Sequence, residues 1–176
     1  KMAFSFLTPG CTVSFGGSMT LEDTGMLTAL RHDPGITLLD RAQAKTPEET
    51  KKIYHDALSS DFYFMSTNAI TKDGELVNID GTGNRVAALI YGPEHVIVMA
   101  GMNKVAANVD EALSRVHGTA TPMNCKRLGK NTPCSATGVC SDCLSPDCIC
   151  NQVVITRRSG IEGRIKVILI GEELGY

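Results

Sequence analysis

The chain has 176 residues, a formal net charge of -2, 43% hydrophobic residues and 20% charged residues. These values are ordinary for one globular domain and exclude a largely disordered chain. The 17 Lys and Arg residues are scattered and Trp is absent, so neither a basic stripe nor a base-stacking platform for nucleic acid is expected.

Strands and helices alternate over the first two thirds of the chain. One helix start is especially clear, because Thr46 can cap the helix, Pro47 suits its first position and Glu49 completes a capping box. Gly118 is predicted to end the last helix of this part. The predicted strands cover residues 12–15, 36–39, 62–65 and 95–100, and the predicted helices begin at about residues 21, 46, 85 and 108.

The last third of the chain changes character. Residues 119–151 are rich in Pro, Gly, Asn, Ser and Cys, which predicts a long cysteine-rich insertion loop. Two strands follow, over residues 152–156 and 165–170, and their connection is compatible with a hairpin. We therefore predict a single α/β domain over residues 1–176. It is a three-layer sandwich with a mainly parallel sheet and an antiparallel edge hairpin at the C-terminus.

The location of the protein is predicted from absent patterns and from cysteine usage. No apolar run approaches the roughly 20 residues that span a bilayer, and no secretory signal pattern is visible. Of the seven Cys residues, five lie within residues 134–150. A secreted disulfide framework usually has cysteines spread through a shorter chain. We therefore expect a cytoplasmic protein with reduced or metal-bound thiols.

One stretch, residues 66–92, combines a turn, a polar loop of small residues and a helix start. Gly81 and Gly83 flank Thr82 in that loop, and Arg85 falls near the start of the helix. A phosphate or carboxylate could accept hydrogen bonds from the backbone N–H groups and from the guanidinium fork of Arg85. The stretch fits neither a Walker P-loop nor a Rossmann fingerprint. The alternative is a capped helix start with a solvated arginine, and the residues favour neither interpretation.

Three charged side chains extend this hypothesis. Asp73 and Asp80 are candidates for a general base or for hydrogen-bond acceptors of hydroxyl groups. Lys104 follows an apolar strand and could reach the same crevice, although a solvated lysine is the commoner case because lysine is seldom buried.

A second candidate for anion binding precedes the first helix. Gly16 and Gly17 would let the backbone approach a ligand closely, and Ser18 adds a hydroxyl group. Short glycine turns are common, so this motif alone favours a simple strand-to-helix turn.

The cysteine-rich segment is the other place where the sequence indicates chemistry. About four thiolates that converge on one centre can hold a zinc ion, and thiolates also hold iron–sulfur clusters. The spacing matches neither the ferredoxin run nor two paired C-x-x-C motifs. Metal or cluster binding is favoured, with redox or disulfide thiols and plain structural thiols as alternatives. The candidate thiols are Cys134, Cys140, Cys143, Cys148 and Cys150.

Nearly the whole chain resembles the LUD-domain family, the lactate utilisation protein C-like proteins. The resemblance is most specific in the middle of the chain, and it also covers the first glycine motif, the cysteine segment and the C-terminal strand. The segments that carry it are residues 16–22, 68–71, 73–87, 103–105, 132–151 and 167–175.

The resemblance implies a NagB/RpiA/CoA-transferase-like fold and further helical sequence before residue 1. It also implies an anion-holding crevice, in which Asn78 and Asp80 belong to the working face. Among the cysteines, the set typical of the family is Cys134, Cys140, Cys143 and Cys150. The expected catalytic residues are Asp80, Asp73 and Asn78, and the expected ligand-binding residues are Gly16, Gly17, Ser18, Asn68, Gly81, Thr82, Gly83, Asn84, Arg85 and Lys104.

Three functions remain open from the sequence. The first is a role in lactate or related organic-acid utilisation, with a small-anion pocket and an iron–sulfur cluster or zinc ion on the cysteine loop. It would bind a small anionic ligand, and iron–sulfur oxidoreductase subunits are its possible protein partners. A homo-oligomer is a further option. We expect no nucleic acid and no membrane among its partners. The second is a sugar-phosphate or CoA-ester enzyme. The third is a binding or regulatory module with a structural cysteine loop.

Overall fold

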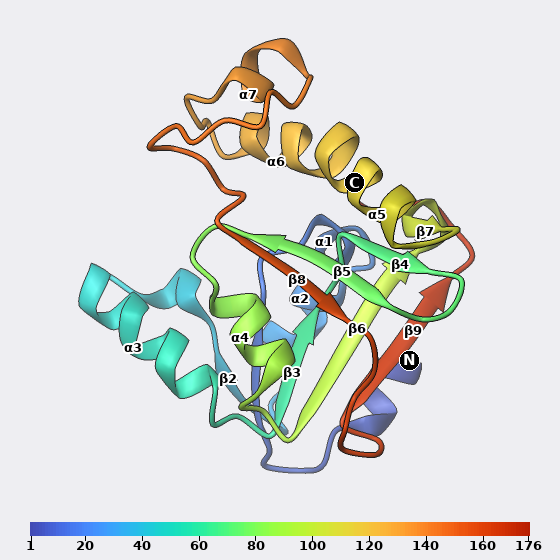
Figure 1. The fold of residues 1–176 in the computed structure, drawn as a ribbon. Helices are drawn as coiled ribbons and strands as arrows, with labels where there is room; N and C mark the ends of the chain where they lie inside the picture. Colours follow the sequence, from blue (N-terminus) through green and yellow to red (C-terminus); the bar gives the residue numbers. More distant parts are fainter.

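The computed structural model describes all 176 residues, and its central element is a five-stranded sheet. The strand order of this sheet, sheet A, is β2-β1-β3-β6-β9, and every neighbouring pair is parallel. Its strands are β1 (Thr12–Phe15), β2 (Thr37–Leu39), β3 (Phe62–Met65), β6 (His95–Gly101) and β9 (Ile165–Ile170). The carboxyl ends of all five strands therefore lie at one edge, which is where ligands bind in open α/β sheets (Figure 1).

A smaller mixed sheet, sheet B, lies beside sheet A. Its order is β7-β4-β5-β8, with β4 and β5 antiparallel and β7 parallel to β4. The strands are β4 (Ala69–Thr71), β5 (Leu76–Asp80), β7 (Val105–Ala106) and β8 (Gln152–Thr156).

The core is divided by the alternation of side chains along the strands. On β3, Phe62 and Phe64 face α1 and α2, whereas Tyr63 and Met65 face α3, α4 and sheet B. The far face of sheet B packs against α5. The helices concerned are α1 (Met19–Asp23), α2 (Met26–Arg31), α3 (Pro47–Ala57), α4 (Asn84–Ile90) and α5 (Val109–Arg115). The predicted three-layer α/β fold with a mainly parallel sheet is confirmed (Figure 1).

The predicted C-terminal hairpin is wrong. β8 pairs antiparallel with β5 in sheet B, and β9 pairs parallel with β6 in sheet A. The buried side chain of Arg164 supplies a reason, because its guanidinium donates to the carbonyl oxygens of Ala88, Leu89 and Pro93 at the end of α4. Free carbonyls at a helix end favour a cation there. This contact holds the start of β9 beside β6, away from β8.

The predicted insertion loop over residues 119–151 is partly helical. α5 continues through a π-helical turn, η4 (Val116–Ala120), into α6 (Thr121–Arg127), and α7 (Pro133–Thr137) follows. Gly118 lies inside η4 and does not end the helix, because its φ is not positive. A glycine stops a helix when it adopts the left-handed conformation, and here it continues the helix instead. The short helices and turns of the chain also include η1 (Met2–Phe6), η2 (Arg41–Gln43) and η3 (Met102–Lys104).

The predicted polar loop after residue 77 begins later than expected. β5 runs to Asp80, and Asn78 in its middle is completely buried. The polar sequence of this strand is explained by the hydrogen bonds described below for Arg85.

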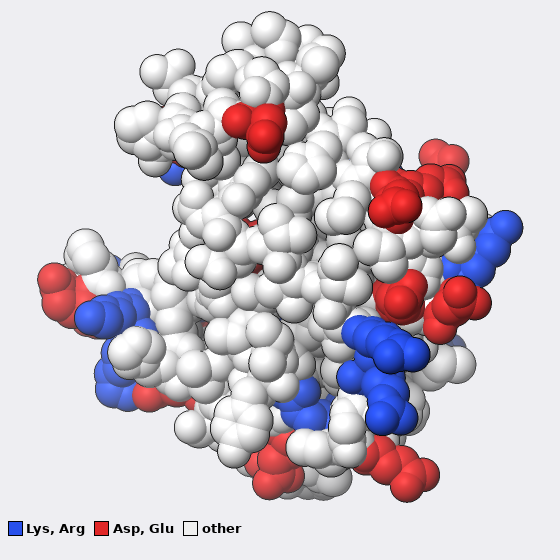
Figure 2. Space-filling view, in the orientation of Figure 1, with Lys and Arg blue, Asp and Glu red and all other residues white.

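The surface in the orientation of Figure 1 has no single-sign charged region. Figure 2 shows acidic and basic side chains interspersed around the edge of this face, with a mostly uncharged centre. None of the helices combines the length and the apolar character that crossing a lipid bilayer requires.

Candidate functional site

A polar cleft of about 480 Å³ lies at the carboxyl edge of sheet A. The segments that follow β1, β3 and β6 supply its floor, since Ser18, Ser66 and Lys104 come soon after these strands and line it. Parallel strands bring these segments together because their carboxyl ends share one edge. The cleft contains most of the predicted ligand-binding residues, namely Gly17, Ser18, Asn68, Gly81, Thr82, Asn84, Arg85 and Lys104, together with Asp80.

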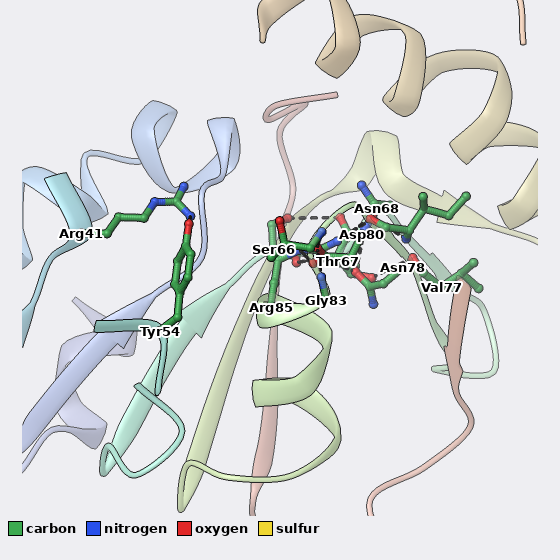
Figure 3. A network of polar contacts seen from close by, with 12 residues as sticks. Arg41, Tyr54, Ser66, Thr67, Asn68, Val77, Asn78, Asp80, Gly83 and Arg85 are labelled. Atoms are coloured by element: carbon green, nitrogen blue, oxygen red, sulfur yellow. Dashed lines mark hydrogen bonds and ion pairs between the residues drawn. The ribbon is translucent and has the colours of Figure 1, made fainter. Parts of the chain in front are cut away.

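Arg85 organises the centre of the cleft wall (Figure 3). Its Nη1 donates to the carbonyl oxygen of Ser66 at 3.1 Å and to Asn78 Oδ1 at 2.5 Å. Its Nη2 donates to Asn68 Oδ1 at 3.0 Å and to the carbonyl oxygen of Ile79 at 2.8 Å. Burial lowers the pKa of Arg85, and the nearby carboxylate of Asp80 opposes that effect.

The guanidinium of Arg85 is therefore fully engaged within the protein. Its remaining donor, Nε, lies 3.3 Å from Asp80 Oδ2. The expectation that Arg85 offers a free fork to a ligand is corrected on this point, because the side chain holds the ends of β3 and β5 together. Arg85 lines the cleft as a positioning residue.

Asp80 is held by the turn that starts α4. Its Oδ1 accepts hydrogen bonds from the backbone N–H groups of Thr82 at 3.2 Å and Gly83 at 2.9 Å. Gly83 adopts a φ of 89°, a conformation that glycine tolerates best. The carboxylate thus lines the cleft in a fixed orientation, and its proposed role as a base stays a prediction.

The other two predicted catalytic residues lie outside the cleft lining. Asn78 is buried beneath it, where its Oδ1 accepts from Arg85 and its Nδ2 has no hydrogen-bond partner. Asp73 lies in the turn between β4 and β5, in a separate cavity with Glu75, Arg157 and Arg158. The structure does not bring Asp73 together with Asp80, because the two residues lie at opposite ends of β5.

The glycines before α1 leave room for arginine side chains. A Cβ on Gly17 would collide with Nη2 of Arg41, and a Cβ on Gly16 would lie 3.1 Å from Cδ of Arg85. Ser18 caps α1, since its Oγ accepts from the N–H of Leu21 at 3.3 Å. This motif therefore shapes the cleft through packing.

Four basic side chains line the cleft without a carboxylate partner. They are Arg41, Lys104, Arg127 and Lys130. The ion pairs of the structure involve other cations, those of Arg31, Lys52 and Arg85. Positive charge that the protein does not neutralise is what an anionic ligand requires.

Sequence reasoning missed three of these cations, because they come from separate elements. Arg41 in η2 donates from Nη1 to the hydroxyl of Tyr54 in α3 at 3.2 Å, as Figure 3 shows. Arg127 in α6 donates from Nε to the hydroxyl of Tyr176 at 2.6 Å. Lys130 follows α6 in the chain. No local motif surrounds any of them, so no sequence signal identified them.

Lys104 is the buried basic residue of the cleft. Its Nζ donates to Ser66 Oγ at 3.1 Å and to the carbonyl oxygen of Thr67 at 3.3 Å. Burial, reinforced by the positive charges of Arg115 and Arg85, lowers the pKa of Lys104 to about 7. Lys104 therefore lies at the cleft and is not the solvated lysine that the sequence favoured, and its role in ligand binding stays a prediction.

The cysteine-rich segment encloses a small cavity of about 20 Å³, separate from the cleft and from the cavity beside Asp73. Cys125 of α6 and His117 of η4 join it, which sequence reasoning missed because they lie outside the dense segment. Cys140 Sγ lies 3.5 Å from His117 Nδ1. Burial raises the pKa of Cys150 to about 12. The thiols that line the cavity are Cys125, Cys134, Cys140, Cys143, Cys148 and Cys150.

These side chains are not arranged around a common metal position. All seven cysteines are free thiols, and no group of three or more His, Cys, Asp or Glu side chains is placed to hold a metal ion. An iron–sulfur cluster or a zinc ion on these thiols stays a prediction, and binding either one would require the thiols to converge.

The cysteine segment also forms one wall of the cleft. Cys148 and Ile149 line both the cleft and the small cavity enclosed by the cysteines. Asn151 Nδ2 donates to the carbonyl oxygen of Gly81 at 2.9 Å, which ties this segment to the loop before α4. The two candidate regions of the sequence are therefore neighbours in space.

Comparison with known proteins identifies one family. The family model of the LUD domain matches residues 2–170 of the chain. No curated protein sequence matches it.

Solved structures that match the chain include proteins from Deinococcus radiodurans and Chaetomium thermophilum. A DUF162 family protein from Deinococcus radiodurans is 12% identical, with 92% of this chain and 88% of that chain covered and a TM-score of 0.39. The eIF2B delta subunit from Chaetomium thermophilum is 20% identical, with 65% of this chain covered and a TM-score of 0.38. A chain of the eIF2B-beta2-delta2 complex from C. thermophilum is 21% identical, with 61% of this chain covered and a TM-score of 0.38. The chain spans 51% and 42% of the length of these two eIF2B chains.

Proposed function

The chain belongs to the LUD domain family, and from this premise we propose that it takes part in lactate or related organic-acid utilisation by binding an organic anion in the cleft. The observation that supports the proposal is the set of three cations without carboxylate partners, Arg41, Arg127 and Lys130. Arginine presents a planar fork of donors that matches a carboxylate, and lysine adds a point charge.

Arg41 and Arg127 are the cations best placed to contact such a ligand. Each is oriented by a tyrosine hydroxyl, that of Tyr54 or Tyr176, so its side chain is partly ordered before a ligand arrives. A preordered donor loses less conformational freedom on binding.

Calorimetric titration with L-lactate and with pyruvate tests the proposal. We expect both anions to bind, and the Arg127→Gln and Arg41→Gln variants to lose about tenfold or more in affinity, since a hydrogen bond to a charged group contributes about 1.5–3 kcal/mol. Arg157→Gln is the matched control, because Arg157 lies in the other cavity, beside Asp73. Equal affinities in all variants, or no binding of either anion, would contradict the proposal.

The size of the cleft favours a second candidate, an enzyme or binding protein for a sugar phosphate or a CoA ester. A volume of about 480 Å³ and three available cations exceed what a three-carbon monoanion fills. Phosphate carries more charge and more acceptor oxygens than a carboxylate. Titration with ribose 5-phosphate and with coenzyme A, beside lactate, separates the candidates by affinity.

A zinc ion or iron–sulfur cluster on the cysteine segment is proposed separately, together with iron–sulfur oxidoreductase subunits as partners. The expected ligands are Cys134, Cys140, Cys143 and Cys150, which line one small cavity together and would have to converge to share a metal ion. A bound cluster would supply electron transfer. Metal analysis and visible absorbance of anaerobically purified protein test it. If the purified protein contains no metal and binds none of these anions, the third function is favoured, a binding or regulatory module with a structural cysteine loop.

A further inference from the structure

Lys104 differs from the other basic residues of the cleft in its burial. Its side chain lies at the floor, with 4% of the residue exposed, and no carboxylate pairs with it. Lysine is almost never fully buried unless it is paired. Burial of an unpaired ammonium is costly, and proteins avoid that cost by releasing the proton.

The hydrogen bonds of Lys104 match a neutral amine. A neutral amine has two N–H groups, and the structure gives Nζ two acceptors, Ser66 Oγ and the carbonyl oxygen of Thr67. An ammonium would carry a third N–H without an acceptor. With both hydrogens engaged, the nitrogen lone pair remains free at the floor of the cleft.

The charged groups around Lys104 act in the same direction. Arg115 of α5 and Arg85 of α4 are the nearby cations, and both disfavour a further positive charge. Asp23 of α1 is the one acidic group that favours the ammonium, and its Oδ2 already accepts from the N–H of Gly175. A lysine that is desolvated beside other cations is the kind that proteins use as an amine nucleophile.

We propose that Lys104 forms a reversible imine with a 2-oxo acid held in the cleft, a step that rests on the proposed anion site. The Nζ lone pair attacks the carbonyl carbon, a carbon–nitrogen bond forms and the carbon–oxygen bond breaks. The two hydrogens of the amine leave with the carbonyl oxygen as water, so the step needs neither oxidant nor reductant. In this proposal the carboxylate of the 2-oxo acid is bound by Arg41 and Arg127, which line the same cleft as Lys104.

This chemistry separates a 2-hydroxy acid from the corresponding 2-oxo acid. Lactate has no carbonyl carbon at C2 and can only bind, whereas pyruvate, its two-electron oxidation product, can both bind and form the imine. The site would therefore hold the oxidised product longer than the alcohol.

Borohydride trapping tests the inference. The full chain is incubated with pyruvate or with lactate, reduced with sodium borohydride, digested and examined by mass spectrometry. We expect one stable adduct with pyruvate, on the peptide that contains Lys104, and none with lactate. Lys51→Arg is the matched control on the exposed face of α3 and should be trapped like the wild type.

Two variants make the result decisive. Lys104→Arg keeps a basic side chain and Lys104→Met keeps the side-chain length, and neither variant should form the adduct. Circular dichroism checks that each variant is folded. Calorimetry separates the two proposals. Pyruvate that binds without an adduct on Lys104 overturns the imine and leaves the anion site standing, whereas no binding of pyruvate or lactate overturns both.

Discussion

The backbone of Ile149 crosses Gly81 so closely that a Cβ on Gly81 would lie 3.3 Å from Cα of Ile149. Together with the hydrogen bond from Asn151 to the carbonyl oxygen of Gly81, this contact joins the cysteine segment to the loop that starts α4. Ile149 and Cys148 line both the cleft and the cysteine-lined cavity. A change in the cysteine segment is therefore transmitted to the cleft through packing, and the reverse also holds.

A larger side chain at Gly81 should separate these two regions. We expect Gly81→Val to lose about 1–3 kcal/mol of stability, as overpacking does, to weaken anion binding and to speed the reaction of the thiols with a disulfide reagent. Urea unfolding and thiol titration measure these effects. Gly160→Val is the matched control, because a Cβ on Gly160 meets no atom within 4 Å. Thiol reactivity unchanged in Gly81→Val would argue against the coupling.

Arg85 should be the most sensitive residue of the cleft wall. In Arg85→Met the carboxylate of Asp80 and the oxygens of Asn68 and Asn78 lose their donor, so we expect a loss of about 3–5 kcal/mol, as for other broken buried pairs. Urea unfolding measures the loss. Lys52→Met breaks an exposed ion pair with Asp56 and should cost about 0–1 kcal/mol. Similar losses for the two variants would show that Arg85 does not organise the wall.

Lys104 should make stability depend on pH in the alkaline range. Its pKa is about 7 in the folded protein and about 10.4 in an unfolded chain, so the unfolded state binds more protons between these values. Stability therefore rises with pH from about 7 to about 10 and is reduced below that window.

Urea unfolding of the wild type and of Lys104→Met at several pH values within that window measures the effect. The stability of the wild type relative to the variant should increase with pH. A constant difference would mean that Lys104 titrates as an ordinary exposed lysine.

Asp61 should contribute the opposite dependence at low pH. Its Oδ2 accepts from the backbone N–H of Thr12 at 2.6 Å and from Thr12 Oγ1 at 2.7 Å, and these hydrogen bonds lower the pKa of Asp61. A carboxyl group whose pKa is lower in the folded state stabilises above its unfolded pKa, about 3.9, and loses that contribution as the pH falls through the folded value.

Thermal unfolding of the wild type and of Asp61→Asn between pH 7 and pH 3 tests this dependence. The wild type should melt at a higher temperature near neutral pH, and the two curves should converge as the carboxyl becomes protonated. Parallel curves would contradict the assigned role of Asp61.

The local elements of this protein follow from its local sequence. Thr46 caps α3, since its Oγ1 accepts from the N–H of Glu49, and Glu49 Oε2 in turn accepts from the N–H of Lys45. Asn108 and Glu111 do the same at the start of α5. The short apolar runs became the parallel strands β3 and β6. The position of the cleft could also be predicted, because the loops after parallel strands meet at one edge.

The partners across the fold were decided by the tertiary structure. Nothing near Arg85 in the chain indicates that its donors are taken by Ser66, Asn68 and Ile79, and so the sequence suggested a free guanidinium. The cations that are available, Arg41 and Arg127, come from elements far apart in the sequence.

The sequence alone therefore determined the starts of α3 and α5, most of the strands and the edge that carries the cleft. The folded chain decided which charges remain available, how β9 pairs and that the cysteine segment forms a wall of the cleft. The physical reason is the separation along the chain between the residues that interact. Caps and periodicity depend on residues within about four positions of each other, whereas charge neutralisation and strand pairing depend on groups that only folding brings together.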